Sequence, residues 1–435
     1  MKKKTILKRL LKLIIVIVIL VLVVFLGYQL FINPYRGTAE NFIASLPVES
    51  ELTEKQVLED IDYTIGKLRE RHPAWLEDDN KNVAAVEDAY KTERQQVIDD
   101  GVDTYTVIDE WRIIGRIMHQ LYDGHSRISY MDDDAYYIED FTQLKELGLP
   151  AEINGIPTEK IVDDYLEIFQ YEREEYARAC VDYFIENESC LEWVGVDTSD
   201  GVRFTYDTEE GKKDYHYSFV PYEQVKGAEE DDDDEWVSYK IDESSNTAVF
   251  TLEECNYNDY YESTLEGFFN QVNEKEIGNI IVDLRGNGGG NSYVADAFLQ
   301  YLDIDGYDGW SSDVRYGDFL IHNEPYHVDI QKKENAFSGN IYVLTDVYTY
   351  SAAMDFTMLI SDNHLGTVIG EASGNLPDAY GDILRFSLPN SKLGLTISYK
   401  NWHRIDQSKK GEPIEPDYIC DPKEALSKAK QLISD

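Results

Sequence analysis

The chain has 435 residues, four cysteines and a formal net charge of −44. So negative a chain would be repelled by a phosphate backbone, and we expect no nucleic-acid partner. The cysteines form no CxxC pair, which argues against a structural zinc site and against a small disulfide-stapled domain, although Cys180 and Cys190 could pair.

Residues 1–34 predict a membrane anchor. Six basic residues precede an apolar run from Leu13 to Ile32, and about twenty such residues are enough to span a bilayer. A cleaved signal peptide is the alternative, but no convincing small-residue cleavage site ends the run. Because positively charged flanks stay in the cytoplasm, we expect a single-pass protein of the cell membrane whose remaining chain is extracytoplasmic.

The next two segments predict a helical domain and a mixed one. Residues 35–130 are assigned as helical because apolar residues recur at helical spacing between Thr53 and Tyr122. Residues 131–240 combine helical and strand-like patterns. The acidic run at 229–235 lacks the alternating ligands and the glycine of an EF-hand loop, so it predicts a solvated loop at a segment boundary rather than a calcium site.

Residues 241–435 predict an α/β domain, because strand and helix patterns alternate along them. Such alternation indicates a sheet with helices packed on it. The expected strands are Thr247–Leu252, Asn279–Leu284, Ile341–Thr345, Thr367–Gly370, Ile383–Leu388 and Lys392–Tyr399, and the expected helices are Tyr293–Leu302, Ala352–Ile360 and Pro422–Ile433.

The most specific motif is the glycine-rich turn that follows the second of these strands. It reads Asp-Leu-Arg-Gly-Asn-Gly-Gly-Gly from Asp283 to Gly290. Glycines let a backbone approach a ligand closely and expose successive N–H groups. A tight connection and a phosphate cradle are alternatives, but the Lys-Ser/Thr end of a P-loop is missing. An oxyanion hole is the use that the turn fits best.

This string resembles the signature of the C-terminal processing, or tail-specific, serine peptidases, in the histidine branch related to the tricorn core. The resemblance covers about the second half of the chain and one short motif near Gly124. It implies a crotonase-like (ClpP/crotonase) α/β core, no metal and no cofactor. Many relatives carry a PDZ module for peptide tails in the middle of the chain, and none is recognisable in residues 131–240.

Ser351 is the candidate nucleophile. It follows a buried strand and stands at the expected start of a helix, where the helix dipole and the free N–H of Ala352 can stabilise an oxyanion. A simple capping serine is the alternative, but Met354 stands where a capping box would have an acid or amide. The segment also resembles the family's nucleophile motif, and we expect the N–H groups of Gly288 and Ala352 to form the oxyanion hole.

His125 is the candidate base. The family uses either a lysine shortly after the nucleophile helix or a histidine far upstream, and no lysine lies between Ser351 and Lys392, with Asn375 in the loop where it would stand. Asp123-Gly124-His125-Ser126 resembles the family's Asp-Gly-His-Thr motif. A histidine can accept the serine proton and return it to the leaving amine near neutral pH. A turn histidine without chemistry is the alternative.

A glutamate near the C-terminus is expected to orient the base, as the resemblance implies. Glu412 is our choice and Glu415 the competitor. The register of the motif is open, because the family's glutamate usually lies farther from the Pro416-Asp417 pair than Glu412 does. An exposed, non-functional role is the alternative for both. Gly124 replaces the serine that precedes the histidine in the tricorn-like branch, so a full tetrad is not expected.

These patterns together predict a membrane-anchored extracytoplasmic serine endopeptidase acting on peptides or unfolded proteins through Ser351, His125 and Glu412. The alternatives from other classes are a catalytically inactive protein that binds peptides or hydrophobic ligands on the same scaffold, and a surface protein whose acidic face meets cationic partners.

Overall fold

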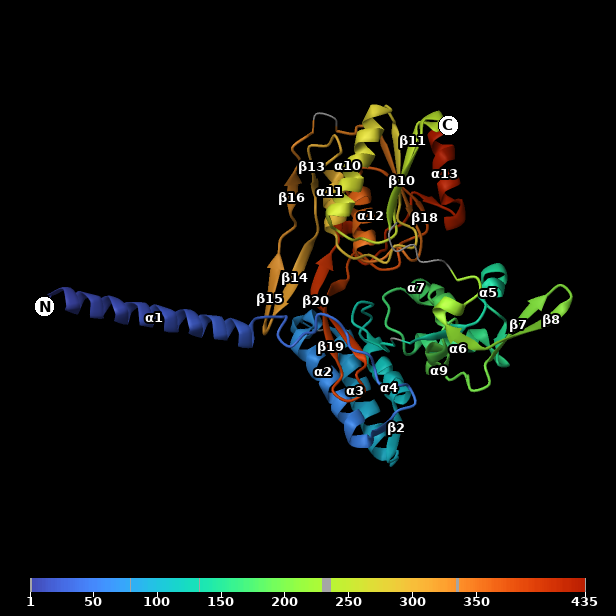
Figure 1. The fold of residues 1–435 in the computed structure, drawn as a ribbon, viewed down its shortest axis with the longest axis horizontal. Coiled ribbons are helices and arrows are strands. Elements are labelled where there is room, and N and C mark those ends of the chain that lie inside the picture. The colour runs from blue at the N-terminus through green and yellow to red at the C-terminus, as the bar shows by residue number, and fades with distance from the viewer. Residues whose placement is uncertain (1, 79, 133, 229–235, 334–335, 435) are drawn as a thin grey trace.

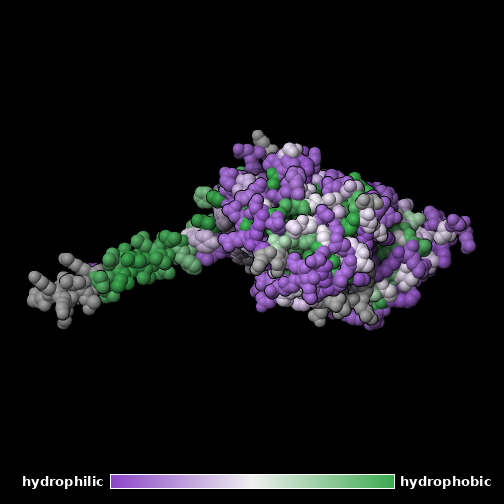
Figure 2. All heavy atoms as spheres, turned by 90° about the horizontal axis from the view of Figure 1, so that it is seen from above, coloured by the Kyte–Doolittle hydropathy of each residue, from purple (hydrophilic) through white to green (hydrophobic). Residues whose placement is uncertain are grey.

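We describe the protein from a computed structural model, in which residues 2–78, 80–132, 134–228, 236–333 and 336–434 are described. The acidic run at 229–235 lies outside them. Helix α1 (Lys2–Phe31) extends away from the body of the molecule (Figure 1). Its segment Leu10–Phe31 is long and apolar enough to cross a membrane, and none of it is buried against the rest of the chain. Figure 2 shows this apolar surface projecting from a largely polar body.

Three helices form the N-terminal unit: α2 (Glu54–Arg71), α3 (Lys81–Asp99) and α4 (Val107–His119). Thr53 begins α2 with a capping box to Gln56, and a second capping box begins α4. These boxes satisfy the free N–H groups of the first turn. Val57, Ile61 and Leu68 are buried, so the helical spacing seen in the sequence marks the packed face.

The middle of the chain contains short elements. Its four-stranded antiparallel sheet has the order β6-β5-β7-β8. Its helices and strands, including the paired strands β7 and β8, confirm the mixed helical and strand-like patterns expected for this part of the chain. The elements are β3 (Ile128–Ser129), β4 (Tyr136–Ile138), α5 (Thr142–Leu147), β5 (Glu152–Ile153), β6 (Ile156–Pro157), α6 (Thr158–Leu166), α7 (Glu174–Ala179), α8 (Val181–Phe184), α9 (Glu188–Trp193), β7 (Val202–Thr208), β8 (Gly211–Tyr217) and β9 (Phe219–Pro221).

A six-stranded sheet of order β10-β11-β12-β17-β18-β21 forms the α/β part, and all its neighbouring strands are parallel except β10 and β11. Helices α10, α11 and α12 share one buried core with it, and α13 packs against the residues of the other face. The elements are β10 (Val237–Asp242), β11 (Thr247–Leu252), α10 (Asp259–Glu274), β12 (Asn279–Asp283), α11 (Tyr293–Leu299), β17 (Asn340–Thr345), α12 (Ala352–Asp362), β18 (Thr367–Gly370), β21 (Tyr418–Ile419) and α13 (Pro422–Ser434).

The carboxyl ends of the parallel strands lie at one edge of this sheet. There the glycine-rich turn after β12 meets the segment between β17 and α12. Tyr350 N donates to Asn287 O at 2.9 Å, and Gly286 N donates to both carboxylate oxygens of Asp346. The two loops are therefore joined by hydrogen bonds, at the edge where α/β sheets usually place their ligands.

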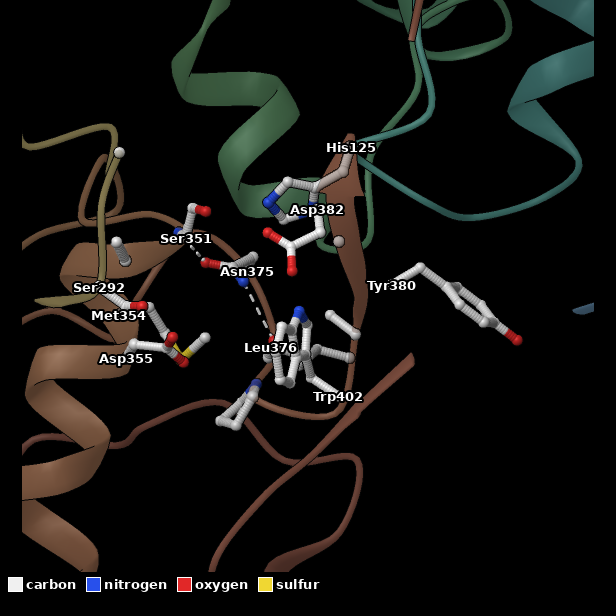
Figure 3. A pocket seen from close by; sticks show the side chains of 15 residues that line it. His125, Ser292, Ser351, Met354, Asp355, Asn375, Leu376, Tyr380, Asp382 and Trp402 are labelled. Atoms are coloured by element: carbon white, nitrogen blue, oxygen red, sulfur yellow. Dashed lines mark hydrogen bonds between the residues drawn. The ribbon is translucent and has the colours of Figure 1, made fainter. Parts of the chain in front are cut away.

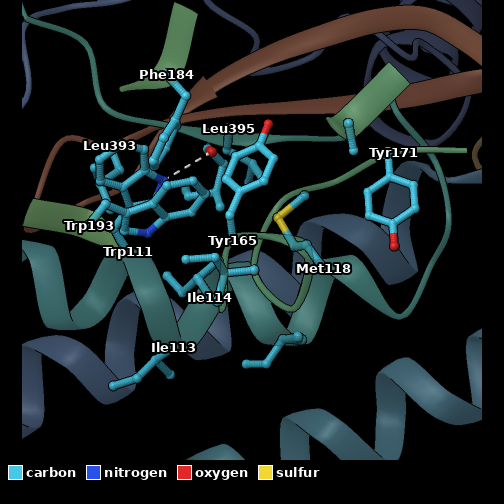
Figure 4. Close-up of a cluster of buried hydrophobic side chains, with 14 of the residues drawn as sticks. Trp111, Ile113, Ile114, Met118, Tyr165, Tyr171, Phe184, Trp193, Leu393 and Leu395 are labelled. Carbon is cyan, nitrogen blue, oxygen red and sulfur yellow. Dashed lines mark hydrogen bonds between the residues drawn. The ribbon is translucent and has the colours of Figure 1, made fainter. Parts of the chain in front are cut away.

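A second sheet connects the α/β part to the helical unit. Its strands are β14 (Ser311–Tyr316), β15 (Phe319–Asn323), β19 (Tyr380–Ser387) and β20 (Gly394–His403), and β20 also pairs with β3. Leu393 and Leu395 enter the same buried core as Trp111 and Tyr165 (Figure 4). This shared core fixes β3, and with it the loop that carries His125, relative to the α/β part.

The predicted elements of the α/β part are confirmed, with ends that differ by a few residues. Helix α11 ends at Leu299 rather than Leu302, and β20 begins at Gly394 rather than Lys392. Strand β10 starts at Val237, so the sheet begins before residue 241. Cys180 and Cys190, both described, are free, so the pairing considered from the sequence is not present.

Candidate active site

Ser351 and His125 line one pocket although they come from different parts of the chain. Ser351 directly precedes helix α12, and the loop after α4 carries His125. Figure 3 shows the two side chains facing each other. The pocket has a free volume of about 60 Å³ and opens to solvent. The structure thus brings together the two residues that the sequence suggested as nucleophile and base.

Ser351 has a backbone conformation that residues other than glycine rarely adopt. Its φ is 51° and its ψ −121°, and helix α12 begins at the next residue. Its hydroxyl makes no capping hydrogen bond, so the capping alternative is not what the structure has. Ser351 N donates to Asn375 Oδ1 at 2.7 Å, which holds the serine in place. Strain of this kind between a strand and a helix is typical of an exposed nucleophile.

The glycine-rich turn lies directly against Ser351. A side chain at Gly289, whose φ is +101°, would come within 2.7 Å of Ser351 Cβ and 2.9 Å of Ala352 N. Only glycine fits there. Gly288 N and Ala352 N donate to no described residue, and Gly288 is exposed. Both N–H groups are therefore free for a developing oxyanion beside the serine, and their assignment as its donors stays a prediction.

Backbone contacts hold His125 at the pocket. His125 N donates to Asp123 Oδ1 at 2.8 Å, and Thr396 Oγ1, from β20, donates to His125 O at 2.7 Å. The imidazole lies against the ring of Tyr350, with 5.1 Å between centroids. The position of the base thus depends on the second sheet as well as on its own loop.

Glu172 is the carboxylate beside His125, and sequence reasoning did not find it. His125 Nδ1 lies 3.4 Å from Glu172 Oε1, and it has no hydrogen-bond partner among the described residues. Contacts of this kind commonly tighten in a substrate complex. Gly124 N and Leu376 N donate to Glu172 at 3.3 and 3.0 Å. Burial alone would lower the pKa of His125, but the Glu172 carboxylate, with Asp123, raises it above its ordinary value.

Comparison with known proteins agrees with this geometry. The family model of peptidase family S41 matches residues 246–420. This part of the chain is similar to peptidase family S41. The S41 match spans less than half of the chain and includes the glycine-rich turn and Ser351, whereas His125 and Glu172 lie outside it. This match, together with Ser351 and His125 in one pocket, identifies the protein as a serine-type peptidase.

Solved structures show the same fold over most of the chain. Mature CPAF complexed with lactacystin has a TM-score of 0.63 at 10% identity and covers 88% of this chain and 97% of its own. Mature CPAF gives 0.61 at 9%, with 88% and 96% covered, and a mutant of CPAF gives 0.63 at 11%, with the same coverage. At such low identity the likeness is one of fold, and it covers far more of the chain than residues 246–420.

Glu412 and Glu415 are not brought to the pocket of Ser351 and His125. Both side chains are exposed, and neither residue lines the pocket. The Glu412 carbonyl accepts from Arg404 Nη1 at 3.2 Å, which holds this segment. The expectation for Glu412 is therefore corrected: the buried carboxylate next to the imidazole belongs to Glu172, from the middle of the chain.

Asp123 is fully buried and accepts the backbone N–H of His125. Its Oδ2 lies 3.0 Å from Nε2 of His72, which is also fully buried, and accepts from Ser398 Oγ at 2.8 Å. Burial would raise the pKa of Asp123, but His72 and the charge of His125 hold it well below its ordinary value. His72 therefore serves packing and hydrogen bonding behind the pocket, in line with its place before a proline.

Ligand atoms of Asp123, His125 and Glu172 lie within 4.8 Å of one another. Because Asp123 is engaged with His72 and Glu172 with two backbone N–H groups, the set forms a hydrogen-bonded support for the imidazole rather than a cation site. A second such set, Asp313, His322 and His403, lies on β14, β15 and β20 and lines no part of the pocket.

Replacing Gly124 with alanine is expected to destabilise the protein by about 1–3 kcal/mol and to lower kcat. The new methyl group would lie 2.2 Å from the buried hydroxyl of Tyr350, whose ring packs on His125. Thermal unfolding and peptide hydrolysis measure the two effects. Gly66→Ala is the control, because nothing lies within 4 Å of its added carbon, and equal stability of both variants would contradict the prediction.

Proposed function

We propose that the chain is a membrane-anchored extracytoplasmic serine endopeptidase that hydrolyses peptide bonds with Ser351 as nucleophile and His125 as base. The observation that carries the proposal is the single pocket that contains both side chains, with Ser351 strained at the start of α12. Glu172 takes the orienting role that the sequence had suggested for Glu412. Peptides or unfolded proteins are the substrates that the family match suggests.

In the first step His125 takes the Ser351 proton while the hydroxyl oxygen attacks the peptide carbonyl. The N–H groups of Gly288 and Ala352 are the proposed donors to the oxyanion, which would form at the N-terminal, positively polarised end of helix α12. His125 then protonates the leaving amine, and water releases the acyl group by the same route. Glu172 stabilises the imidazolium formed in each half of the reaction.

Helix α1 is the proposed anchor, and residues 35–435 would lie outside the cytoplasm. Support comes from the exposed apolar segment Leu10–Phe31 and from the basic residues before it. We further propose the division into a helical domain at 35–130, a mixed segment at 131–240 and a crotonase-like catalytic domain at 241–435. The parallel strands with helices on both faces support the last of these.

The test is labelling of the full chain, in detergent, by a fluorophosphonate probe. Wild type should be labelled, and Ser351→Ala and His125→Ala should not. Because the base must be neutral to accept a proton, the labelling rate should rise as the pH passes through the raised pKa of His125. Ser292→Ala removes the other serine of the pocket and should still be labelled. Labelling that survives Ser351→Ala, or none in folded wild type, would favour an inactive binding protein.

A further inference from the structure

Asp355 is a feature of the pocket that the proposed mechanism does not use. It lies one helical turn after Ser351 on α12, and its N–H donates to Ser351 O at 2.9 Å. It lines the pocket, and Figure 3 shows its side chain pointing from α12 into the space beside Ser351. Its carboxylate makes no hydrogen bond or ion pair with another described residue. A carboxylate so placed lacks a partner of opposite charge.

The charges around the pocket leave Asp355 unbalanced. None of the described residues that line the pocket is a lysine or an arginine. Asp382, on the opposite wall, is paired with Lys400 of β20, so its charge is offset. Asp355 is paired with no lysine or arginine of the described residues, and only the charge of a protonated His125 opposes its own. The pocket therefore presents one uncompensated carboxylate within a side chain's length of the nucleophile.

The remaining walls fit a long side chain with a charged end. The ring of Trp402 and the apolar side chains of Met354 and Leu376 line the same pocket as Asp355. Apolar walls accommodate the methylene stem of lysine or arginine, and aromatic faces attract their charged groups. The chain's net charge of −44 also attracts cationic peptides toward the protein.

We propose that Asp355 binds the cationic side chain, lysine or arginine, of the substrate residue whose carbonyl is attacked by Ser351. The inference rests on the proposed function and names its substrate class: peptides cut after a basic residue. The ammonium or guanidinium group would pair with the Asp355 carboxylate, its stem would lie along Trp402, and the carbonyl would lie at Ser351. A neutral side chain of the same shape would leave the carboxylate without a partner.

The preference should depend on pH. Burial raises the pKa of Asp355 to about 7, with Asp382 adding to the rise and His125 opposing it. Below that pH the carboxyl is neutral and attracts no cation; above it the charge is present, so selectivity grows as pH rises. The titratable groups that face Asp355 from the neighbouring elements are His125, Asp382, Asp296, Tyr326 and Cys255.

The experiment compares matched peptides with the full chain in detergent. Two quenched peptides differ only at the residue before the cleaved bond, arginine in one and citrulline in the other, and a second pair has lysine and norleucine. We expect kcat/KM ratios of roughly 10 to 100 at pH 8 that fall toward one at pH 6. Because both peptides of a pair need the same neutral His125, its titration cancels in the ratio.

Asp355→Asn should bring the ratios close to one at every pH, whereas Asp355→Glu should keep part of the preference. Asp305→Asn removes one negative charge from a fully exposed position and should leave the ratios unchanged, which separates a local pairing from the general charge of the chain. Wild-type ratios within about twofold of one, or ratios that Asp355→Asn preserves, would overturn the inference while leaving the peptidase intact. Absence of both labelling and hydrolysis would instead overturn the proposed function, and this inference with it.

Discussion

Replacing Glu172 with glutamine is expected to lower kcat/KM by roughly 10²- to 10⁴-fold, whereas Glu412→Gln should change it by less than about twofold. Glu172 is 5% exposed and lies 3.4 Å from His125 Nδ1, so its charge stabilises the imidazolium that forms during the reaction. A glutamine has no charge for this task. Glu412 is exposed and does not line the pocket, so its replacement removes nothing that the reaction uses.

The pH profile distinguishes this role from a structural one. Because Glu172 helps to raise the pKa of His125, glutamine should lower that pKa and shift the acidic limb of kcat/KM to lower pH. Simple loss of packing would lower the rate at all pH values without moving the limb. Thermal unfolding of both variants gives the structural control. A full effect from Glu412→Gln, with none from Glu172→Gln, would restore the assignment made from the sequence alone.

Most of the α/β part could be predicted from the sequence because its elements are long or strongly patterned. The strand Thr247–Leu252 and the strand Thr367–Gly370 have the predicted bounds, and α12 starts at the predicted residue, Ala352. Each of these strands is a short apolar run that ends at a turn, and such a run is typical of a buried strand. The shared core of the helical unit and β20 could not be predicted, because it joins residues whose sequence patterns are independent.

The site was predictable where a motif marks it. Ser351 and His125 carried recognisable neighbours, and the structure places both in one pocket. Glu172 had no such neighbours: it lies between short helices, and only tertiary folding brings it to His125. Nothing in the sequence distinguishes Asp355 from other acidic residues of helices; only the fold shows that it faces the pocket. Motifs thus report the reacting atoms, whereas the groups that tune them depend on the packing.

Removing the Asp123 carboxylate is expected to be the most destabilising of these changes, at about 3–5 kcal/mol for Asp123→Ala. The side chain is fully buried and accepts hydrogen bonds from His125 N and Ser398 Oγ, while His72 Nε2 lies 3.0 Å away. Alanine would leave these three polar groups buried without their partner. Because one of them belongs to the loop of His125, peptide hydrolysis should fall together with stability.

Urea unfolding at a series of pH values measures this contribution. The pKa of Asp123 is lowered by folding, so its stabilisation is complete above the unfolded value of about 3.9 and is lost as pH falls toward the folded value. The difference between wild type and Asp123→Ala should therefore be constant from pH 7 to about pH 5 and should shrink below about pH 4. Asp88→Ala, at an exposed surface pair with Lys91, should stay within about 0.5 kcal/mol of wild type. A loss below about 1 kcal/mol at pH 7 would mean that water or neighbouring groups replace Asp123, and that the position of His125 depends on Glu172 and β20 alone.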